Sequence, residues 1–225
     1  MASSTHSHPT GAVVVFSGGQ DSTTCLLQAI AERGPEQVAC ITFAYGQRHS
    51  LEVSVAGRIA NLLGVRNHRI VKTDWFNAVT TNALLDPQTP ISREGDSLPN
   101  TFVAGRNAFF LLAAAVYART LGWCDIVTGV CETDYSGYPD CRAAFVESMN
   151  QSINLAMDGN FRILTPLMHL NKAQTWALAD RLGKLDFVRR ETLTCYEGIP
   201  GDGCGKCPAC LLRAKGLKEY EQTYR

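Results

Sequence analysis

Two groups of residues in this chain have the types and the spacing that chemistry requires. The first is Ser17-Gly18-Gly19-Gln20-Asp21-Ser22, which follows the apolar residues 13–16 and precedes a segment with helical spacing. Glycines let backbone N–H groups approach an anion closely, and a helix N-terminus adds unpaired donors and a partial positive charge. This stretch therefore predicts a phosphate site, to which the hydroxyls of Ser17, Ser22 and Thr23 can donate hydrogen bonds.

The second group is a set of four cysteines in one short glycine-rich stretch: Cys195, Cys204, Cys207 and Cys210. Four thiolates with this spacing are typical of a tetrahedral Zn²⁺ site, and such a site is structural because it leaves no ligand position open. Iron–sulfur clusters also use four cysteines, and the spacing alone leaves that alternative open. We expect zinc, because phosphate chemistry at the first group needs no electron carrier.

The composition is that of a soluble globular protein with one sizeable α/β domain. The chain has 225 residues, is 45% hydrophobic, and balances 21 Lys+Arg against 21 Asp+Glu. A nucleic-acid partner would normally require a basic excess, so we expect none. No apolar run could span a bilayer, and residues 1–10 lack the apolar core of a secretory signal. With nine cysteines, an odd number, this indicates a cytoplasmic protein with reduced thiols.

Strand and helix patterns alternate along the chain, which predicts a parallel twisted sheet with helices on both faces. The expected strands are residues 12–16, 37–43, 66–72, 125–130 and 161–165, and the expected helices are residues 22–33, 51–63, 142–157 and 172–182, with an apolar helix after residue 107 through about residue 121. Residues 74–101 show no such pattern and predict a long loop. We divide the chain into a disordered leader (1–10), a nucleotide-binding α/β domain (11–190) and a four-cysteine segment packed on it (191–225).

Two cations stand at the starts of further expected helices. Arg106, in Gly105-Arg106-Asn107, repeats the arrangement of the first loop and can meet a second anion, or it is a solvated helix-start residue. Lys172 begins the helix 172–182, where the macrodipole disfavours a cation. A phosphate facing Lys172 would offset that cost, and an ordinary surface lysine is the alternative.

Residues 131–142 are dense in hydrogen-bonding groups at the end of an expected strand. Carboxylates and aromatic rings together suit a flat heterocycle, because rings stack on it and a carboxylate accepts the paired N–H donors of a guanine-like edge. A turn with a helix cap is the alternative. The candidate ligands in this segment are Glu132, Asp134, Tyr138, Asp140 and Arg142.

The loop Ser-Gly-Gly-x-Asp-Ser resembles the PP-loop of ATP pyrophosphatases. Nearly the whole chain after the leader is similar to the 7-cyano-7-deazaguanine (preQ0) synthase family. The residues that carry this likeness are Phe16–Ser22, Tyr45-Gly46-Gln47-Arg48-His49, Gly105-Arg106-Asn107, residues 129–142, Thr165-Pro166-Leu167-Met168 and the four cysteines. Two positions depart from the family pattern: Ala104 stands where Pro is usual, and Ala44 where Asp is common.

The resemblance implies a Rossmann-like fold and an ATP-dependent C–N ligase of queuosine precursor synthesis. Its substrates would be 7-carboxy-7-deazaguanine, ammonia and ATP, with Mg²⁺, and its products the nitrile preQ0, AMP and pyrophosphate. It further implies one structural zinc ion per chain. Together with the apolar helix around residues 109–117, it also suggests a homodimer.

The site roles that follow are expectations from motif and resemblance. The PP-loop would hold pyrophosphate while Arg106 and Lys172 offset charge. Glu132, Asp134 or Asp140 would read the guanine edge, and Arg142 or Arg48 the substrate carboxylate. The expected catalytic residues are Ser17, Asp21, Ser22, Arg106 and Lys172, and the expected ATP-binding residues are Phe16, Ser17, Gly18, Gly19, Gln20, Asp21, Ser22, Thr23, Thr24, Cys25 and Leu26.

Two other function classes share part of this pattern. A PP-loop ligase or thiolase that modifies tRNA has the same loop and often paired cysteines, but it would favour a basic surface. A non-catalytic nucleotide sensor or zinc-ribbon module would not need polar groups at three strand ends.

Overall fold

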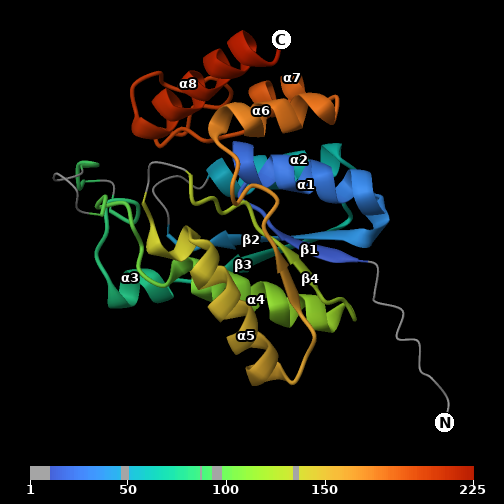
Figure 1. The fold of residues 1–225 in the computed structure, drawn as a ribbon. Coiled ribbons are helices and arrows are strands. Elements are labelled where there is room, and N and C mark those ends of the chain that lie inside the picture. Colours follow the sequence, from blue (N-terminus) through green and yellow to red (C-terminus); the bar gives the residue numbers. More distant parts are fainter. Residues whose placement is uncertain (1–10, 47–50, 87, 93–97, 134–136) are drawn as a thin grey trace.

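A five-stranded parallel sheet with the order β3-β2-β1-β4-β5 forms the centre of the protein, and it confirms the predicted fold class (Figure 1). The computed structural model describes residues 11–46, 51–86, 88–92, 98–133 and 137–225. The strands are β1 (Ala12–Val15), β2 (Val38–Ala44), β3 (Asn67–Lys72), β4 (Asp125–Val127) and β5 (Arg162–Leu164).

Eight α-helices of the described residues surround this sheet. They are α1 (Gln20–Arg33), α2 (Leu51–Leu62), α3 (Trp75–Val79), α4 (Arg106–Thr120), α5 (Ala143–Met157), α6 (Lys172–Arg181), α7 (Leu185–Glu191) and α8 (Pro208–Thr223). Helices α1 and α2 cover one face of the sheet, and α4 and α5 cover the other (Figure 1). Helices α6, α7 and α8 form a further layer beyond α1 (Figure 1).

Strand β1 is buried on both faces, which explains its unbroken apolar sequence. Successive side chains of a strand point to opposite faces. Val14 packs in the cluster with Leu26 and Ala56 from α1 and α2. Val13 packs in the cluster with Leu111 from α4. The first predicted strand is thus the central element on which both helix layers rest.

The strand order reverses next to β1, and this position fixes where a ligand can bind. The chain proceeds from β1 outward through β2 to β3, and then returns to place β4 on the other side of β1. Ligands of open α/β sheets bind at the carboxyl ends of the strands beside such a switch point. The loop Ser17-Gly18-Gly19 leaves β1 at this point and leads directly into α1.

Several element boundaries differ from the sequence-based expectation. Helix α1 begins at Gln20 and not at residue 22, because Gly19 is its N-cap and accepts a hydrogen bond from Thr23 N at 3.0 Å. Strand β4 ends at Val127 and not at residue 130. Residues 74–101 are not wholly irregular, since they contain the short helix α3. Helices α7 and α8 are not among the helices expected from the sequence.

The layer of α6, α7 and α8 is joined to the sheet domain through α1. Leu27 of α1 lies in one buried cluster with Trp176 of α6, Val188 of α7 and Tyr220 of α8. The indole Nε1 of Trp176 donates a hydrogen bond to the carbonyl of Arg213 at 3.2 Å. The helix whose N-terminus carries the predicted phosphate site is therefore packed between the sheet and the segment that follows the cysteines. Among the described residues, no helix combines the length and the apolar character needed to cross a membrane.

Candidate active site

The loop after β1 is held by its own hydroxyl groups. The Ser17 and Ser22 Oγ atoms lie 3.0 Å apart, and Ser22 Oγ also accepts from Ser17 N at 3.3 Å. Gly19 N donates to Ser17 Oγ at 3.3 Å. These contacts close the loop over the first turn of α1, whose leading N–H groups have no partner within the helix. The two serines of the predicted site therefore hold the shape of the loop.

Gly18 is the position at which this loop requires glycine. Its φ is +79°, and a Cβ there would lie 2.9 Å from Ala56 N of α2. Gly129, which follows β4, meets the other side of the same turn, because a Cβ there would lie 3.1 Å from Asp21 C and Ser22 N. The loop is thus enclosed by close backbone contacts from α2 and from the β4 end, which leave no room for a side chain.

The predicted ATP-binding residues that follow the loop lie inside the fold. The side chains of Thr23, Thr24, Cys25 and Leu26 are fully buried in α1. Thr24 Oγ1 donates to Gln20 O at 2.9 Å, and burial raises the pKa of the Cys25 thiol well above its ordinary value. Phe16 is also buried and packs edge-on against His68, with the two ring centres 6.3 Å apart. The structure brings these side chains beneath the loop and not to its open side.

Asp21 and Lys172 form an ion pair across two helices. Lys172 Nζ lies 2.6 Å from Asp21 Oδ2, and the two side chains are 10% and 29% exposed respectively. Asp21 Oδ1 is buried and lacks a hydrogen-bond partner within the described part of the chain. Lys172 was expected to face phosphate or to lie on the surface; the structure places it beside the loop, paired with the loop carboxylate.

Arg106 lies in a second polar cluster, together with two of the residues predicted to bind substrate. Arg106 donates to the Tyr45 hydroxyl at 3.4 Å. Asp140 is buried and accepts from Asn107 N at 3.3 Å, so it caps the first turn of α4. Tyr138 packs against the Phe102 ring, with ring centres 5.4 Å apart, and its hydroxyl lies 2.6 Å from Thr101 Oγ1. The predicted site residues Arg106, Tyr138 and Asp140 therefore lie in one cluster.

Tyr45, Thr101 and Tyr196 belong to this cluster and were absent from the predicted site residues. Tyr196 directly follows the first cysteine of the metal motif, and it interacts electrostatically with Tyr138 and Arg106. Burial raises the pKa of both Tyr45 and Tyr196, which keeps the two phenols neutral. Tyr45 could have been found from its place at the end of β2. Nothing local in the sequence indicates that Tyr196 lies near enough to Arg106 to interact with it electrostatically, since this proximity depends on how the cysteine segment packs.

Glu132 and Arg142 lie together at the start of α5, and both are exposed. Glu132 Oε1 accepts from Ala143 N at 3.0 Å, so this carboxylate stabilises the helix N-terminus. Its other oxygen lies 3.9 Å from His169 Nδ1. Arg142 is the N-cap residue of α5 and makes no side-chain cap bond. The two remaining substrate candidates, Arg48 and Asp134, lie outside the described residues.

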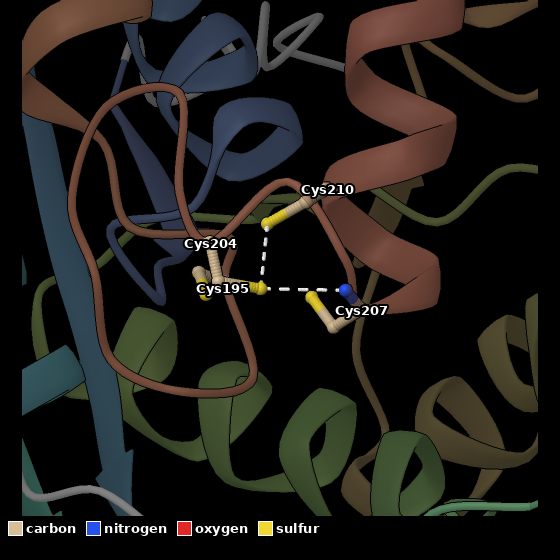
Figure 2. Close-up of side chains that lie close together, drawn as sticks. All are labelled: Cys195, Cys204, Cys207 and Cys210. Carbon is tan, nitrogen blue, oxygen red and sulfur yellow. Dashed lines mark hydrogen bonds between the residues drawn. The ribbon is translucent and has the colours of Figure 1, made fainter.

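The four predicted metal ligands come together as the sequence indicated (Figure 2). The Sγ atoms of Cys195, Cys204, Cys207 and Cys210 all lie within 4.8 Å of one another. The Sγ atoms of Cys204 and Cys210 are 3.9 Å apart. The edge of a tetrahedron with metal–sulfur bonds of ~2.3 Å is ~3.8 Å, so this spacing fits a tetrahedral metal ion. The cluster can hold one metal ion.

Backbone N–H groups donate to the sulfurs of Cys204 and Cys195 in this cluster, whereas burial raises the pKa of Cys207 and Cys210. Cys204 Sγ accepts from Cys207 N at 3.3 Å and from Lys206 N at 3.4 Å, and these bonds lower the pKa of Cys204 to about 6. Cys195 Sγ accepts from Glu197 N at 3.3 Å. N–H donors to sulfur favour the thiolate, which is the form that binds metal. Gly203 is required here, because a Cβ there would lie 2.3 Å from Cys210 Sγ.

The segment that leads into the cysteine cluster also touches the phosphate loop. Leu193 N donates to Gly18 O at 3.0 Å, and Gln20 N donates to Thr194 Oγ1 at 3.2 Å. Thr194 immediately precedes the metal ligand Cys195. The phosphate loop and the metal cluster are therefore neighbours in space, although the sequence separates them widely.

Comparisons with known proteins agree with this fold. A family model described as queuosine biosynthesis protein QueC matches residues 11–221. The fold is similar to that of an ammonia-dependent NAD synthetase from Campylobacter jejuni, with a TM-score of 0.50 and 15% identity over 81% of this chain and 68% of that one. It is also similar to a 4-thiouridine synthetase in a complex with RNA and bound ATP, with a TM-score of 0.50 and 17% identity. That match covers 94% of this chain but spans only half of the synthetase chain, and identities this low show a shared fold alone.

Proposed function

The chain belongs to the QueC family of queuosine biosynthesis proteins and is thereby an ATP-dependent enzyme of the ligase type, and we propose that it converts 7-carboxy-7-deazaguanine and ammonia to 7-cyano-7-deazaguanine. The observation that carries this proposal is the loop Ser17–Ser22 at the carboxyl end of β1, where it joins the N-terminus of α1. Such a junction suits a pyrophosphate group, because backbone N–H groups and the helix dipole both favour negative charge there.

The proposed reaction has two activation steps. The substrate carboxylate attacks the α-phosphorus of ATP, which forms an acyl adenylate and releases pyrophosphate. Ammonia then displaces AMP and leaves a primary amide after losing a proton. The amide oxygen attacks the α-phosphorus of a second ATP and releases pyrophosphate, and loss of AMP and of the two N–H protons then leaves the nitrile. Both activations are attacks by oxygen on the α-phosphorus, so one loop serves both.

In this proposal the protein contributes positioning and charge and no covalent nucleophile. The backbone of residues 17–22 would hold the β- and γ-phosphates, and a Mg²⁺ ion, for which Asp21 is the candidate protein ligand, would supply positive charge to offset theirs. Lys172 keeps the Asp21 carboxylate paired beside the loop at 2.6 Å, which limits repulsion of the phosphates. Arg106, which donates to neutral Tyr45, would offset charge at the reacting centre.

Substrate recognition is assigned to the cluster around Arg106 and to the start of α5. Tyr138 offers a ring for stacking on the deazaguanine, while Glu132, Asp134 and Asp140 are the candidate acceptors for its N–H edge. Arg142 or Arg48 would meet the substrate carboxylate. Exposed apolar side chains on α4, Leu112 at 42% and Val116 at 51%, support the further proposal of a homodimer.

For the four cysteines we propose one zinc ion per chain. An all-thiolate donor set suits zinc, and four protein ligands leave no position for substrate. The ion would stabilise the segment around residues 195–210 and would take no part in the chemistry.

The reaction is tested by incubating purified protein with ATP, Mg²⁺, ammonium and 7-carboxy-7-deazaguanine. We expect mass spectrometry to detect the nitrile, with two AMP and two pyrophosphate molecules formed for each nitrile. Without ammonium, we expect pyrophosphate release but no amide or nitrile. If the protein binds ATP but leaves this substrate unchanged, the proposal is wrong, and a tRNA-modifying ligase becomes the reading to pursue.

A further inference from the structure

Arg213 of α8 is a buried cation far from the predicted substrate ligands in the sequence. Its side chain is only 3% exposed. No carboxylate of the described residues lies within ion-pair distance of it, and burial lowers its pKa from the ordinary value. Burying an unpaired charge is costly unless hydrogen bonds compensate for the lost water. The contacts of Arg213 therefore indicate what this cation stabilises.

Four hydrogen bonds from the two terminal nitrogens compensate for most of the water lost around this guanidinium, whose Nε has no hydrogen-bond partner among the described residues. Its two terminal nitrogens donate to Thr192 Oγ1 (2.8 Å), Thr194 Oγ1 (3.1 Å), Val188 O (3.1 Å) and Arg189 O (2.8 Å). The guanidinium also lies over the Trp176 ring, 5.0 Å from its centre. Two of these contacts hold the end of α7, and the two threonines lie on the segment that leads to Cys195. Arg213 therefore fixes this segment from within the core.

Of these acceptors, Thr194 reaches the phosphate loop. Its Oγ1 atom accepts from Arg213 at 3.1 Å and from Gln20 N at 3.2 Å. Gln20 is the first residue of α1, and its N–H is one of the donors that a helix leaves unpaired at its start. The next residue back, Leu193, donates to Gly18 O. The segment held by Arg213 thus contacts the loop at two successive positions.

We propose that Arg213 is a positioning residue for the phosphate loop, acting through the Thr194 hydroxyl on the backbone of Gln20. This inference rests on the proposed use of ATP by the loop Ser17–Ser22. Thr194 uses the N–H of Gln20, which leaves the neighbouring N–H groups of the turn directed at the phosphates. The positive charge of Arg213 also favours anion binding at the loop. A buried cation close behind a helix N-terminus makes the electrostatic potential at that N-terminus more positive.

The chain offers a matched pair of substitutions that separates this role from a general effect on stability. Thr192 and Thr194 both accept from the same Arg213 nitrogen, but only Thr194 also contacts Gln20 N. Thr192→Val and Thr194→Val each replace a hydroxyl with a methyl group and nearly conserve the volume of the side chain. Thr194→Ser keeps the hydroxyl and serves as the rescue variant.

The measurement is calorimetric binding of MgATP, and separately of inorganic pyrophosphate, to the metal-loaded full-length protein. We expect Thr194→Val to weaken both ligands about 10-fold, Thr194→Ser to restore affinity within about 2-fold, and Thr192→Val to stay within about 2-fold of the wild type. In turnover, the Thr194→Val defect should appear mainly in KM for ATP. Metal content, measured by atomic emission, should be the same in all four proteins.

Unchanged MgATP affinity of Thr194→Val, or equal losses in both valine variants, would overturn the positioning role while leaving the proposed function intact. Failure of the wild type to bind MgATP would overturn the proposed function and this inference together. Arg213→Met is expected to weaken MgATP binding more than Thr194→Val, because it removes the charge as well as the tether. The threonine pair tests the inference even if that variant does not fold.

Discussion

Asp21 and Lys172 show how a single contact adjusts the charge of the site. A carboxylate in the first turn of a helix stabilises the helix dipole, but next to bound phosphates it would repel them. Lys172 Nζ lies 2.6 Å from Asp21 Oδ2 and offsets that repulsion. The unfavourable position of Lys172 at the start of α6 has a compensating partner, which is the loop carboxylate.

Replacing Lys172 with Gln should therefore weaken MgATP binding about 10-fold, because it leaves Asp21 as an unpaired anion beside the phosphates. Loss of one partner of this mostly buried pair should also cost roughly 2 kcal/mol of unfolding free energy. The double variant Asp21→Asn/Lys172→Gln should recover part of both losses. Lys184→Gln, an exposed lysine, is the control. Additive effects in the double variant, measured by calorimetry and urea unfolding, would contradict this account.

Single residues could be predicted from the sequence where the contact is local. The two serines of the loop and the four cysteines were found because motif and spacing place each set together. Thr194, Tyr196 and Arg213 were missed because their partners lie far along the chain. Gln20 and Thr194 are 174 positions apart, and no local pattern encodes such a pairing.

The elements packed around the phosphate loop explain why the loop requires glycine at position 18 more strictly than at position 19. Gly18 has a φ of +79° and faces the backbone of α2. Gly19 has an ordinary extended conformation, with φ −78° and ψ 170°. A Cβ at Gly19 would come no closer than 3.4 Å to Ser17 Oγ. The first glycine is required by the packing of α2, and we expect the second to keep the backbone accessible to the phosphates.

Gly18→Ala and Gly19→Ala should consequently fail in different ways. Gly18→Ala should lower the unfolding free energy by roughly 2–4 kcal/mol, since it combines an unfavourable φ with a backbone clash. Gly19→Ala should remain within about 1 kcal/mol of the wild type, yet lose MgATP affinity. Gly183→Ala has a similar φ of +66° with open space around it, so it measures the conformational cost alone. Equal unfolding midpoints for Gly18→Ala and Gly183→Ala would refute the clash.

The order of the strands and of the helices around the sheet could be predicted, whereas several ends, the short helices α3 and α7 and the 16-residue helix α8 could not. Alternating apolar patterns identified each strand and each long helix of the sheet domain. Helix α1 begins two residues earlier than expected because the backbone of Gly19 closes its first turn without a side-chain cap. Helix α7 has seven residues and α3 has five, which is too short for a helical period to appear.

For the whole molecule, the cysteine cluster connects the α6–α8 layer to the site. Cys195 follows the segment that touches the loop, and Cys207 and Cys210 begin α8. A metal ion at this cluster would tie both parts together. Without an ion at the four sulfurs, the segment that leads to Cys195 would be held by the contacts of Arg213 and by side-chain packing.

Removal of the metal should therefore lower both stability and ATP affinity. Native mass spectrometry is expected to show two chains with one zinc ion each. Chelation should lower Tm by at least about 5 °C, since each kcal/mol is worth roughly 2–4 °C in a chain of this size. MgATP affinity should fall in parallel, and added zinc should restore both. Detection of iron in place of zinc would contradict the metal assignment, and retention of full ATP affinity after chelation would contradict the coupling.

The hydrogen bond from Gln20 to Thr194 also has a consequence for how the protein is made. The phosphate loop is synthesised early, but its partner Thr194 follows 174 residues later. At translation rates of about 5–20 residues per second, the nascent chain carries an incomplete loop for roughly 9–35 s. Full affinity for ATP would thus be acquired only after residues 193–213 emerge from the ribosome, so that unfinished chains would bind the nucleotide more weakly.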